Sequence, residues 1–236
     1  MKSKVFPDAA AALHDVFDGA SIMSGGFGLC GNAENCIAEL ARRDVKGLTV
    51  ISNNCGNQGK GLAVLLQQRK VARVIGSFIG GNPDLQAQML AGEIEVELIP
   101  QGTLAERIRA GGAGLGGFFT PTGVGTVVAE GKEVRVIDGK TYLFEAPLKA
   151  DFAIIRAEWG DAYGNLRFKG TARNFSPQMA MAARVAVVEV DELLPLGALK
   201  GEDIHLPGVF VQRIFQGQNY ADPIEYRTTR PRPVAS

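Results

Sequence analysis

The sequence is poor in the residues that build thiol and metal chemistry. It has three cysteines and two histidines in 236 residues, and Cys30, Cys36 and Cys55 form no C-x-x-C pair. This number and spacing argue against a disulfide framework and against a zinc site. Neither His14 nor His205 adjoins a serine or cysteine elbow, so no hydrolase triad is indicated.

Excess charge and long apolar runs are also lacking. The 25 lysines and arginines balance 25 aspartates and glutamates, which leaves no electrostatic drive toward a nucleic-acid partner. No apolar run approaches the roughly 18 residues of a membrane span, and the first residues lack the apolar stretch of a signal peptide. We therefore expect a cytoplasmic protein with no membrane contact, and the 46% hydrophobic content excludes intrinsic disorder.

Strand-length apolar stretches alternate with helix-length amphipathic stretches through the first half of the chain. The expected strands are residues 20–24, 48–52, 72–78 and 94–98, and the expected helices are 34–43, 61–70, 83–91 and 103–110. Thr103 and Glu106 have the spacing of a capping box at the start of the last helix. This alternation predicts an α/β fold with an open, mostly parallel sheet and flanking helices of Rossmann-like type.

The pattern changes after Ala110. The glycine-rich stretch 111–117 predicts a loop rather than a helix, and Asp138-Gly139 between the apolar stretches 133–137 and 140–144 predicts an antiparallel hairpin. Further strands are expected at 152–156 and 184–190, with a short helix at 177–183 between them. We expect one domain over residues 1–228 and an extended tail at 229–236.

A glycine-rich segment follows the first expected strand. Its residues Gly26, Gly28 and Gly31 satisfy G-x-G-x-x-G, the pattern of a dinucleotide site. The acidic residue that such a site needs after the second strand is absent, because that strand ends in Ser52-Asn53-Asn54. Two alternatives therefore stay open: an NAD(P)-dependent oxidoreductase, or glycines that serve only close packing.

Polar side chains end two other expected strands. Gln101 follows Pro100, which restricts the backbone, so its amide N–H groups suit the stabilisation of an oxyanion, although a glutamine here can also serve only to bond neighbouring loop backbone. Asn53 lies on the same rim, although such a residue also satisfies turn backbone. Glu93, Glu95 and Glu97 alternate along a strand, and we expect these like charges to be solvated, or paired across an interface, rather than catalytic.

Six stretches of the sequence resemble one enzyme family. They are residues 18–31, 52–54, 95–114, 120–123, 172–175 and 207–213, and the string 100–114 within the third is the most specific. This set is similar to the A (alpha) subunit of the family I CoA-transferases that act on 3-oxoacids. One departure is Ala33, where the family signature usually has proline.

The resemblance implies covalent catalysis by a glutamate carboxylate that attacks an acyl-CoA thioester and later carries CoA. That glutamate belongs to a Ser-Glu-Asn-Gly stretch of the B subunit, and this sequence contains no such stretch. The resemblance therefore implies a B-subunit partner, in a heterodimer or a dimer of heterodimers, with CoA thioesters as substrates and no permanently bound cofactor.

By the same resemblance, Gln101 stabilises the thioester oxyanion, and the acyl pocket is shaped by Gly25, Gly26, Phe27, Gly28, Gly31 and Asn53. Succinyl-CoA with acetoacetate is the expected substrate pair, with 3-oxoadipate as the alternative acceptor. A binding or regulatory protein that keeps the fold without turnover is the remaining alternative.

Overall fold

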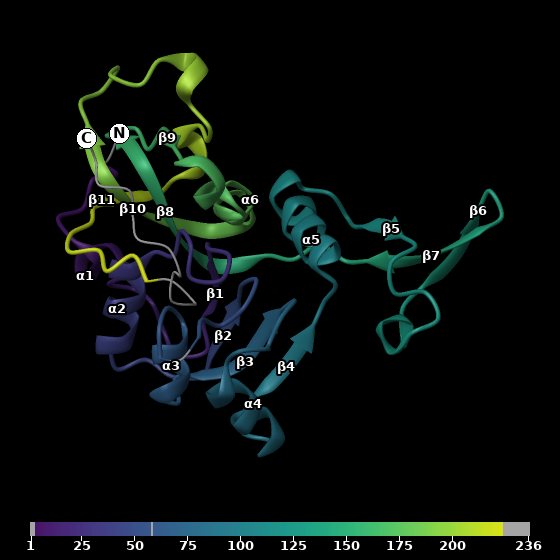
Figure 1. Cartoon of the computed structure of the whole chain (residues 1–236). Helices are drawn as coiled ribbons and strands as arrows, with labels where there is room; N and C mark the ends of the chain where they lie inside the picture. Colours follow the sequence, from purple (N-terminus) through teal and green to yellow (C-terminus); the bar gives the residue numbers. More distant parts are fainter. Residues whose placement is uncertain (1–2, 58, 224–236) are drawn as a thin grey trace, which may run out of the picture.

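The main sheet is open and parallel along its whole path. The computed structural model describes residues 3–57 and 59–223, and within them eight strands form this sheet, in the order β11-β10-β8-β1-β2-β3-β4 with β9 beside β8 (Figure 1). Only β9 runs antiparallel to its neighbour. The strands are β1 Ser21–Ser24, β2 Leu48–Ile51, β3 Val71–Gly76, β4 Glu95–Leu98, β8 Ala150–Asp161, β9 Leu166–Arg167, β10 Ala183–Leu194 and β11 Arg213–Gln216. The predicted fold class is confirmed.

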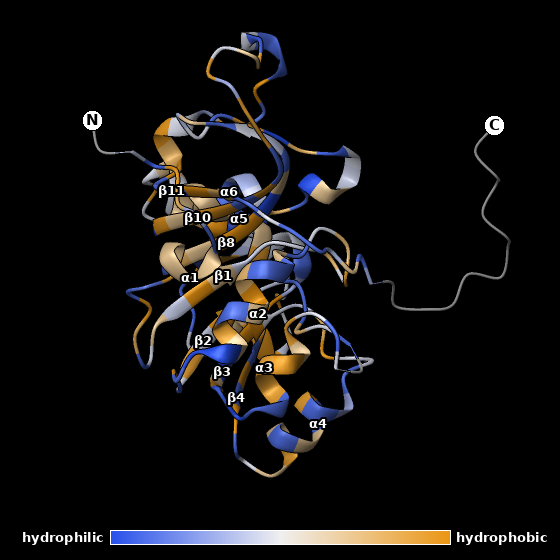
Figure 2. Cartoon of the chain, turned by 90° about the vertical axis from the view of Figure 1, so that its left-hand side faces the viewer, coloured by the Kyte–Doolittle hydropathy of each residue, from blue (hydrophilic) through white to orange (hydrophobic). Residues whose placement is uncertain are grey.

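Helices cover both faces of this sheet. Successive side chains of a strand point to opposite faces, and both faces carry apolar side chains that need to be covered. Ile22 and Val50 pack toward one buried cluster, whereas Met23 and Ile51 pack toward the other. The first cluster lies under α1 Ala9–Ala12, α2 Glu34–Arg42, α3 Ala63–Gln67 and α4 Pro83–Leu90. The second lies under α5 Gln101–Ala113 and α6 Ser176–Ala182. Figure 2 shows the hydrophobic residues concentrated on the strands between these layers.

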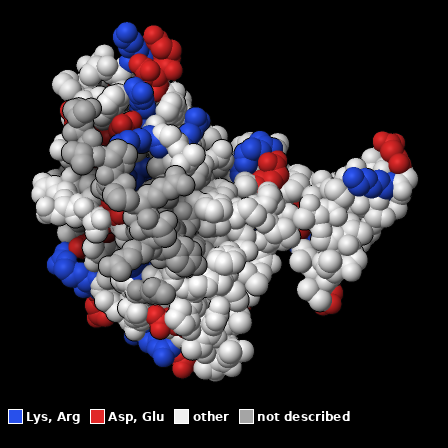
Figure 3. Space-filling view, viewed as in Figure 1, with Lys and Arg blue, Asp and Glu red and all other residues white. Residues whose placement is uncertain are grey.

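A small antiparallel sheet stands out from the body as an arm (Figures 1 and 3). Its strand order is β5-β7-β6, with bounds β5 Phe118–Thr120, β6 Val134–Ile137 and β7 Lys140–Glu145. Asp138 and Gly139 join β6 to β7 with φ of 50° and 75°, the two positive values that a type I′ turn requires. The hairpin prediction is confirmed, while β5 had not been expected as a strand.

The predicted start and end of α5 are both wrong. The helix begins at Gln101 directly after Pro100, so Thr103 is a buried residue of its first turn and caps nothing. It also continues through Gly111 and Gly112 to Ala113. A Cβ on Gly111 would lie 2.1 Å from the Leu148 carbonyl oxygen, so this glycine permits a close helix contact. Tertiary packing here outweighs the low helix propensity of glycine.

The other elements follow the predictions with shifted bounds. Strands β8 and β10 each run 12 residues, well beyond the predicted segments 152–156 and 184–190, and α3 is shorter than 61–70. Short 3₁₀ turns, unpredicted, occur at η1 Val127–Ala129, η2 Gly170–Arg173, η3 Gly201–Asp203 and η4 Gly208–Phe210. The predicted tail at 229–236 lies outside the described residues. Among the helices described, none is long and apolar enough to cross a membrane.

The three glutamates near β4 are paired, but with arginines of this chain rather than across an interface. Glu95 and Glu97 lie 3.2 Å and 2.8 Å from Arg73, and Glu93 is paired with Arg69. Glu97 also contacts Arg107 of α5 at 3.0 Å, so these carboxylates tie β4 to its neighbours in the fold.

Candidate active site

The carboxyl ends of β1, β2, β3 and β4 meet at one edge of the sheet and bring four polar segments together. The glycine loop, residues 25–31, follows β1; Asn53 follows β2, Ser77 follows β3 and Gln101 follows β4. Ligands in open α/β sheets bind at this edge. The residues that the sequence analysis selected therefore converge, and Ser77 joins them.

A chain of hydrogen bonds orients the two amide side chains of this rim. The Gly28 N–H donates to Asn53 Oδ1 at 3.2 Å, and Asn53 Nδ2 donates to Gln101 Oε1 at 2.7 Å. The Ser77 hydroxyl donates to the same Gln101 oxygen. Because a backbone N–H is only a donor, it fixes which end of Asn53 is the acceptor, and Asn53 in turn fixes Gln101.

This orientation leaves the Gln101 Nε2 amide group unused. The atom is buried and has no hydrogen-bond partner among the described residues. A buried donor without a partner is costly, so native proteins keep one chiefly where a ligand or another chain completes it. Two N–H donors held in place by Asn53 and Ser77 are suited to a carbonyl oxygen that gains negative charge.

The glycine loop forms a tight turn rather than an open loop that could surround a phosphate group. Phe27 and Cys30 exchange backbone hydrogen bonds of 3.0 Å and 3.1 Å, and Gly31, with φ of 77°, packs on Ala172. Phe27 is 53% exposed, and its ring stacks on Phe175 with centroids 6.3 Å apart. The loop thus presents an aromatic side chain at the rim.

The N-terminus of α2, where a dinucleotide would place its phosphates, is already filled. The carboxylate of Glu189 accepts the Cys36 N–H at 2.8 Å and the Asn35 N–H at 3.3 Å. Burial raises the pKa of this carboxyl to about 7, partly offset by these hydrogen bonds. Because the anion position holds a protein side chain, the loop does not form the site that its G-x-G-x-x-G pattern suggested.

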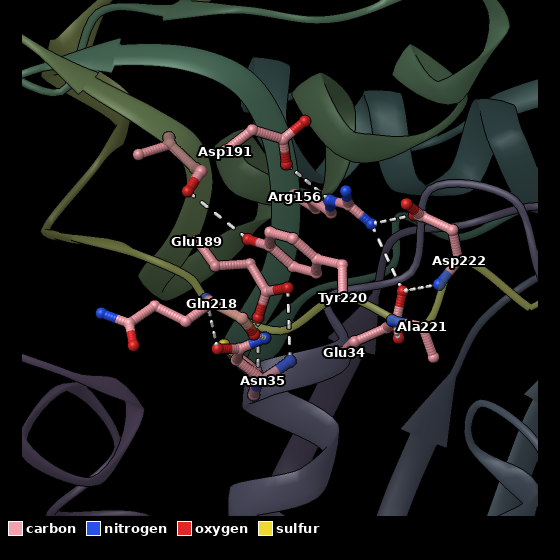
Figure 4. A network of polar contacts seen from close by, with 11 residues as sticks. Glu34, Asn35, Arg156, Glu189, Asp191, Gln218, Tyr220, Ala221 and Asp222 are labelled. Carbon is pink, nitrogen blue, oxygen red and sulfur yellow. Dashed lines mark hydrogen bonds and ion pairs between the residues drawn. The ribbon is translucent and has the colours of Figure 1, made fainter.

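Glu34, the first residue of α2, is likewise committed to the fold (Figure 4). It pairs with Arg156 at 3.3 Å and accepts the Ala221 and Asp222 N–H groups at 2.9 Å and 3.1 Å. Arg156 also binds Asp222 at 2.6 Å and lies 3.5 Å from the centre of the Tyr220 ring. This network fastens the segment after β11 to α2 and leaves Glu34 no free oxygen for chemistry.

No cluster of three or more His, Cys, Asp or Glu side chains within residues 3–57 and 59–223 is placed to hold a metal ion.

The sequence model described as Coenzyme A transferase matches residues 6–217. The chain belongs to the coenzyme A transferase family. Its comparison with curated members and with solved structures agrees with this assignment, and gives the oxidoreductase interpretation no support.

Among the curated members of the family, the A subunit of the succinyl-CoA:3-ketoacid coenzyme A transferase of Helicobacter pylori strain J99 is 48% identical over 97% of this chain and 98% of its own length. The Xanthomonas campestris protein of the same name, from strain B100, is 50% identical over 97% of this chain and 95% of its own. The human mitochondrial succinyl-CoA:3-ketoacid coenzyme A transferase 2 is 45% identical over 97% of this chain. The match spans only 48% of that human protein.

Solved structures of coenzyme A transferases share the fold. The acyl-CoA transferase YdiF of Escherichia coli O157:H7 superposes with a TM-score of 0.83 at 21% identity, over 98% of this chain and 52% of that one. Glutaconate coenzyme A-transferase of Acidaminococcus fermentans gives 0.81 at 18% identity, over 91% and 75%. This chain thus spans about half the length of YdiF.

Two residues of the site were not selected from the sequence as site residues. Ser77 follows β3, which ends at Gly76, but the predicted strand 72–78 included it, so the overlong strand prediction hid it from the strand-end rule. Asn174 accepts the Gly26 N–H at 3.0 Å but lies between η2 and α6, where no strand ends. Its only sequence signal was its place in the family-like stretch 172–175.

Proposed function

We propose that this chain is the A subunit of a succinyl-CoA:3-ketoacid coenzyme A transferase and acts with a B subunit. The observation that carries the proposal is the 48% identity to a curated A subunit over 97% of this chain and 98% of that one. The human relative supports a partner, since about half of its length has no counterpart here. Heterodimer and dimer of heterodimers are both compatible with this argument.

The proposed reaction moves CoA between two carboxylic acids. On the B subunit, a glutamate carboxylate attacks the thioester carbonyl carbon, the carbonyl oxygen becomes an oxyanion, and the C–S bond breaks to release the CoA thiolate. The thiolate then attacks the glutamyl carbonyl of the resulting anhydride, which gives a glutamyl-CoA thioester and releases the donor acid as its carboxylate. The acceptor's carboxylate attacks this thioester to form a second anhydride and free the thiolate, and the thiolate then attacks the acceptor's acyl carbonyl, which gives the new CoA thioester and restores the glutamate. Coenzyme A thioesters are substrates, and no permanently bound cofactor takes part.

The residues of this chain supply electrostatic stabilisation and shape. Gln101 Nε2 donates to the oxyanion, because this buried amide group has no hydrogen-bond partner among the described residues. Asn53 and Ser77 hold that amide in place. Gly25, Gly26, Phe27, Gly28 and Gly31 border the acyl group. The carboxylates Glu34 and Glu189 of the same chain are occupied by the contacts described above, which is consistent with a nucleophile from the partner.

Purification of the tagged chain from its native lysate tests the partner and the substrate together. We expect a second chain that carries Ser-Glu-Asn-Gly to co-purify, and mass measurement of the complex to give its stoichiometry. The eluate is assayed for transfer from succinyl-CoA to acetoacetate and to 3-oxoadipate. Transfer to 3-oxoadipate alone would correct the acceptor, and a chain that is isolated alone and stays inactive with every B-type partner would refute the proposal.

Replacement of Gln101 tests the oxyanion role. In the reconstituted complex we expect Gln101→Ala to preserve assembly and to lower kcat at least tenfold, since one lost oxyanion donor costs on the order of 10² to 10³ in turnover. Gln68→Ala is the matched control, because Gln68 is exposed and directly follows the C-terminal end of α3, away from the rim. Unchanged kcat in Gln101→Ala would rule the role out.

A further inference from the structure

The segment 170–175, which leads from β9 to α6, lies against the glycine loop, although the contacting residues Gly26 and Asn174 are 148 residues apart in sequence. Gly31 of the loop is so close to this segment that a Cβ on it would lie 2.8 Å from the Ala172 carbonyl oxygen. Phe175 stacks on Phe27. The segment therefore contacts the loop at several points between Gly26 and Gly31.

The side chain of Asn174 connects the two ends of the loop. Its Oδ1 accepts the Gly26 N–H at 3.0 Å and the Phe175 N–H at 2.7 Å. Its Nδ2 donates to the Ala172 carbonyl oxygen at 2.8 Å and to the Cys30 carbonyl oxygen at 3.5 Å. One amide group thus contacts the loop near its beginning and near its end.

The backbone of Asn174 is in a conformation that favours glycine. Its φ is 29° and its ψ is −120°, close to the first central position of a type II′ turn, which glycine usually occupies. Strained residues of this kind persist where the surroundings hold them and concentrate at functional sites. An asparagine at such a position suggests that its side chain is needed there.

Asn174 also lies beside the element that carries Gln101. A surface pocket of about 310 Å³ is lined by Gly102 and Ala105 of α5 on one side and by Asn174 and Phe175 on the other. Within the loop, Gly28 lies two residues after Gly26 and begins the hydrogen-bond chain to Asn53 and Gln101. A displaced loop would therefore release the chain that orients the oxyanion donor.

We propose that Asn174 is a positioning residue, which holds the glycine loop so that the Gly28 N–H stays on Asn53 and the Gln101 amide stays oriented for transfer. Asn174 touches no reacting atom in this proposal, and it acts through the loop. The effect on turnover rests on the proposed function, whereas the effect on the loop does not.

Two variants of Asn174 separate its side chain from its backbone strain. Asn174→Gly relieves the backbone and removes the side chain, so we expect a normally folded complex in which kcat falls at least about tenfold and KM changes less than about threefold. Asn174→Asp keeps the strained backbone and the acceptor for Gly26, but it loses the donor and sets a second acceptor 2.8 Å from the Ala172 carbonyl oxygen, so we expect its kcat to fall as well. Asn219→Gly is the matched control, because Asn219 is an exposed asparagine with φ of 54° away from the loop, and its kcat should not change.

Amide hydrogen exchange of the free chain gives a second readout that needs no activity. In Asn174→Gly the exchange of the peptide that contains residues 25–31 should be faster than in the parent chain, with other segments unchanged. Unchanged exchange of this peptide would overturn the proposal. Faster exchange with full kcat in an active complex would overturn the link to turnover. Faster exchange in a chain whose parent never shows transfer would uphold the loop contact and refute the proposed function instead.

Discussion

Substitution of Asn53 by aspartate is expected to reverse the Gln101 amide without touching Gln101. Aspartate keeps an acceptor for the Gly28 N–H, now 3.2 Å from Asn53 Oδ1. Its second oxygen would face Gln101 Oε1, which lies 2.7 Å from the present Nδ2 donor. Two acceptors at that distance repel, and a rotation of the Gln101 amide by half a turn relieves the clash because Nε2 can then donate to the carboxylate.

The rotation places the Gln101 oxygen where the free N–H donors were. A developing oxyanion would then meet a lone pair in place of a donor. The loss should at least equal that of one oxyanion-hole donor, about 10² to 10³ in kcat, or about 3 to 4 kcal/mol in the transition state. The assay is the steady-state transfer of CoA from succinyl-CoA by the reconstituted complex, with thermal unfolding to show that the variant is folded.

Two further variants make this reasoning refutable. Ser77→Ala removes one donor to Gln101 Oε1 but leaves the Asn53 bond, so its loss should stay below about tenfold. Adding Asn53→Asp to Gln101→Ala should cost nothing more, since both act on one group. A folded Asn53→Asp complex that keeps kcat within about threefold of the parent would show that the hydrogen-bond chain does not set the orientation of Gln101.

Two predictions concern stability. Gly111→Ala should destabilise the chain by about 1 to 2 kcal/mol in urea unfolding, because overpacking against Leu148 exceeds the gain in helix propensity. Gly102→Ala in the same helix, with open space at its Cβ, should instead stabilise by up to about 1 kcal/mol, and equal effects of the two would contradict the packing argument. The raised pKa of Glu189 makes its contribution to stability full below its ordinary value of 4.5 and lost as the pH rises through about 7, a change of about 3 kcal/mol in the free energy of unfolding. Glu189→Gln should therefore gain stability relative to the parent between pH 5 and pH 8, and a constant difference across that range would contradict the assignment.

The strands of the main sheet were predictable because the pattern that identifies each strand lies within its own few residues. Pairs such as Ile22 and Met23, or Val50 and Ile51, are apolar at both positions, as expected of strands covered on two faces. The positions of Asp138 and Gly139 were equally readable from turn chemistry. The end of α5 was not, because Gly111 lies in the helix where it packs closely on Leu148, a residue 37 positions further along the chain whose contact has no local signature.

The site was predictable where strand ends carry it. Asn53 and Gln101 follow β2 and β4, and parallel strands bring such residues to one rim. Their relation was not readable from the sequence, since the direction of the Gln101 amide depends on Asn53 and ultimately on the Gly28 N–H. Asn174 could not be predicted for the same reason. Its proposed role depends on contacts with the glycine loop, and only the folded chain brings these two segments together.

The glycine loop shows how one distant residue decides the meaning of a motif. In a dinucleotide site, G-x-G-x-x-G leads into a helix whose free N–H groups bind phosphate. Here α2 follows the loop as that pattern predicts, but Glu189 of β10 supplies the anion from more than 150 residues away. Once the helix end is satisfied internally, the glycines serve close contacts with Ala172 and Asn32, which is consistent with the proposed place of the loop beside the acyl group. No acidic residue follows β2 to bind a ribose, and a buried glutamate on β10 occupies the helix end where a phosphate would bind. Both features argue that the glycine loop of this chain does not bind a dinucleotide.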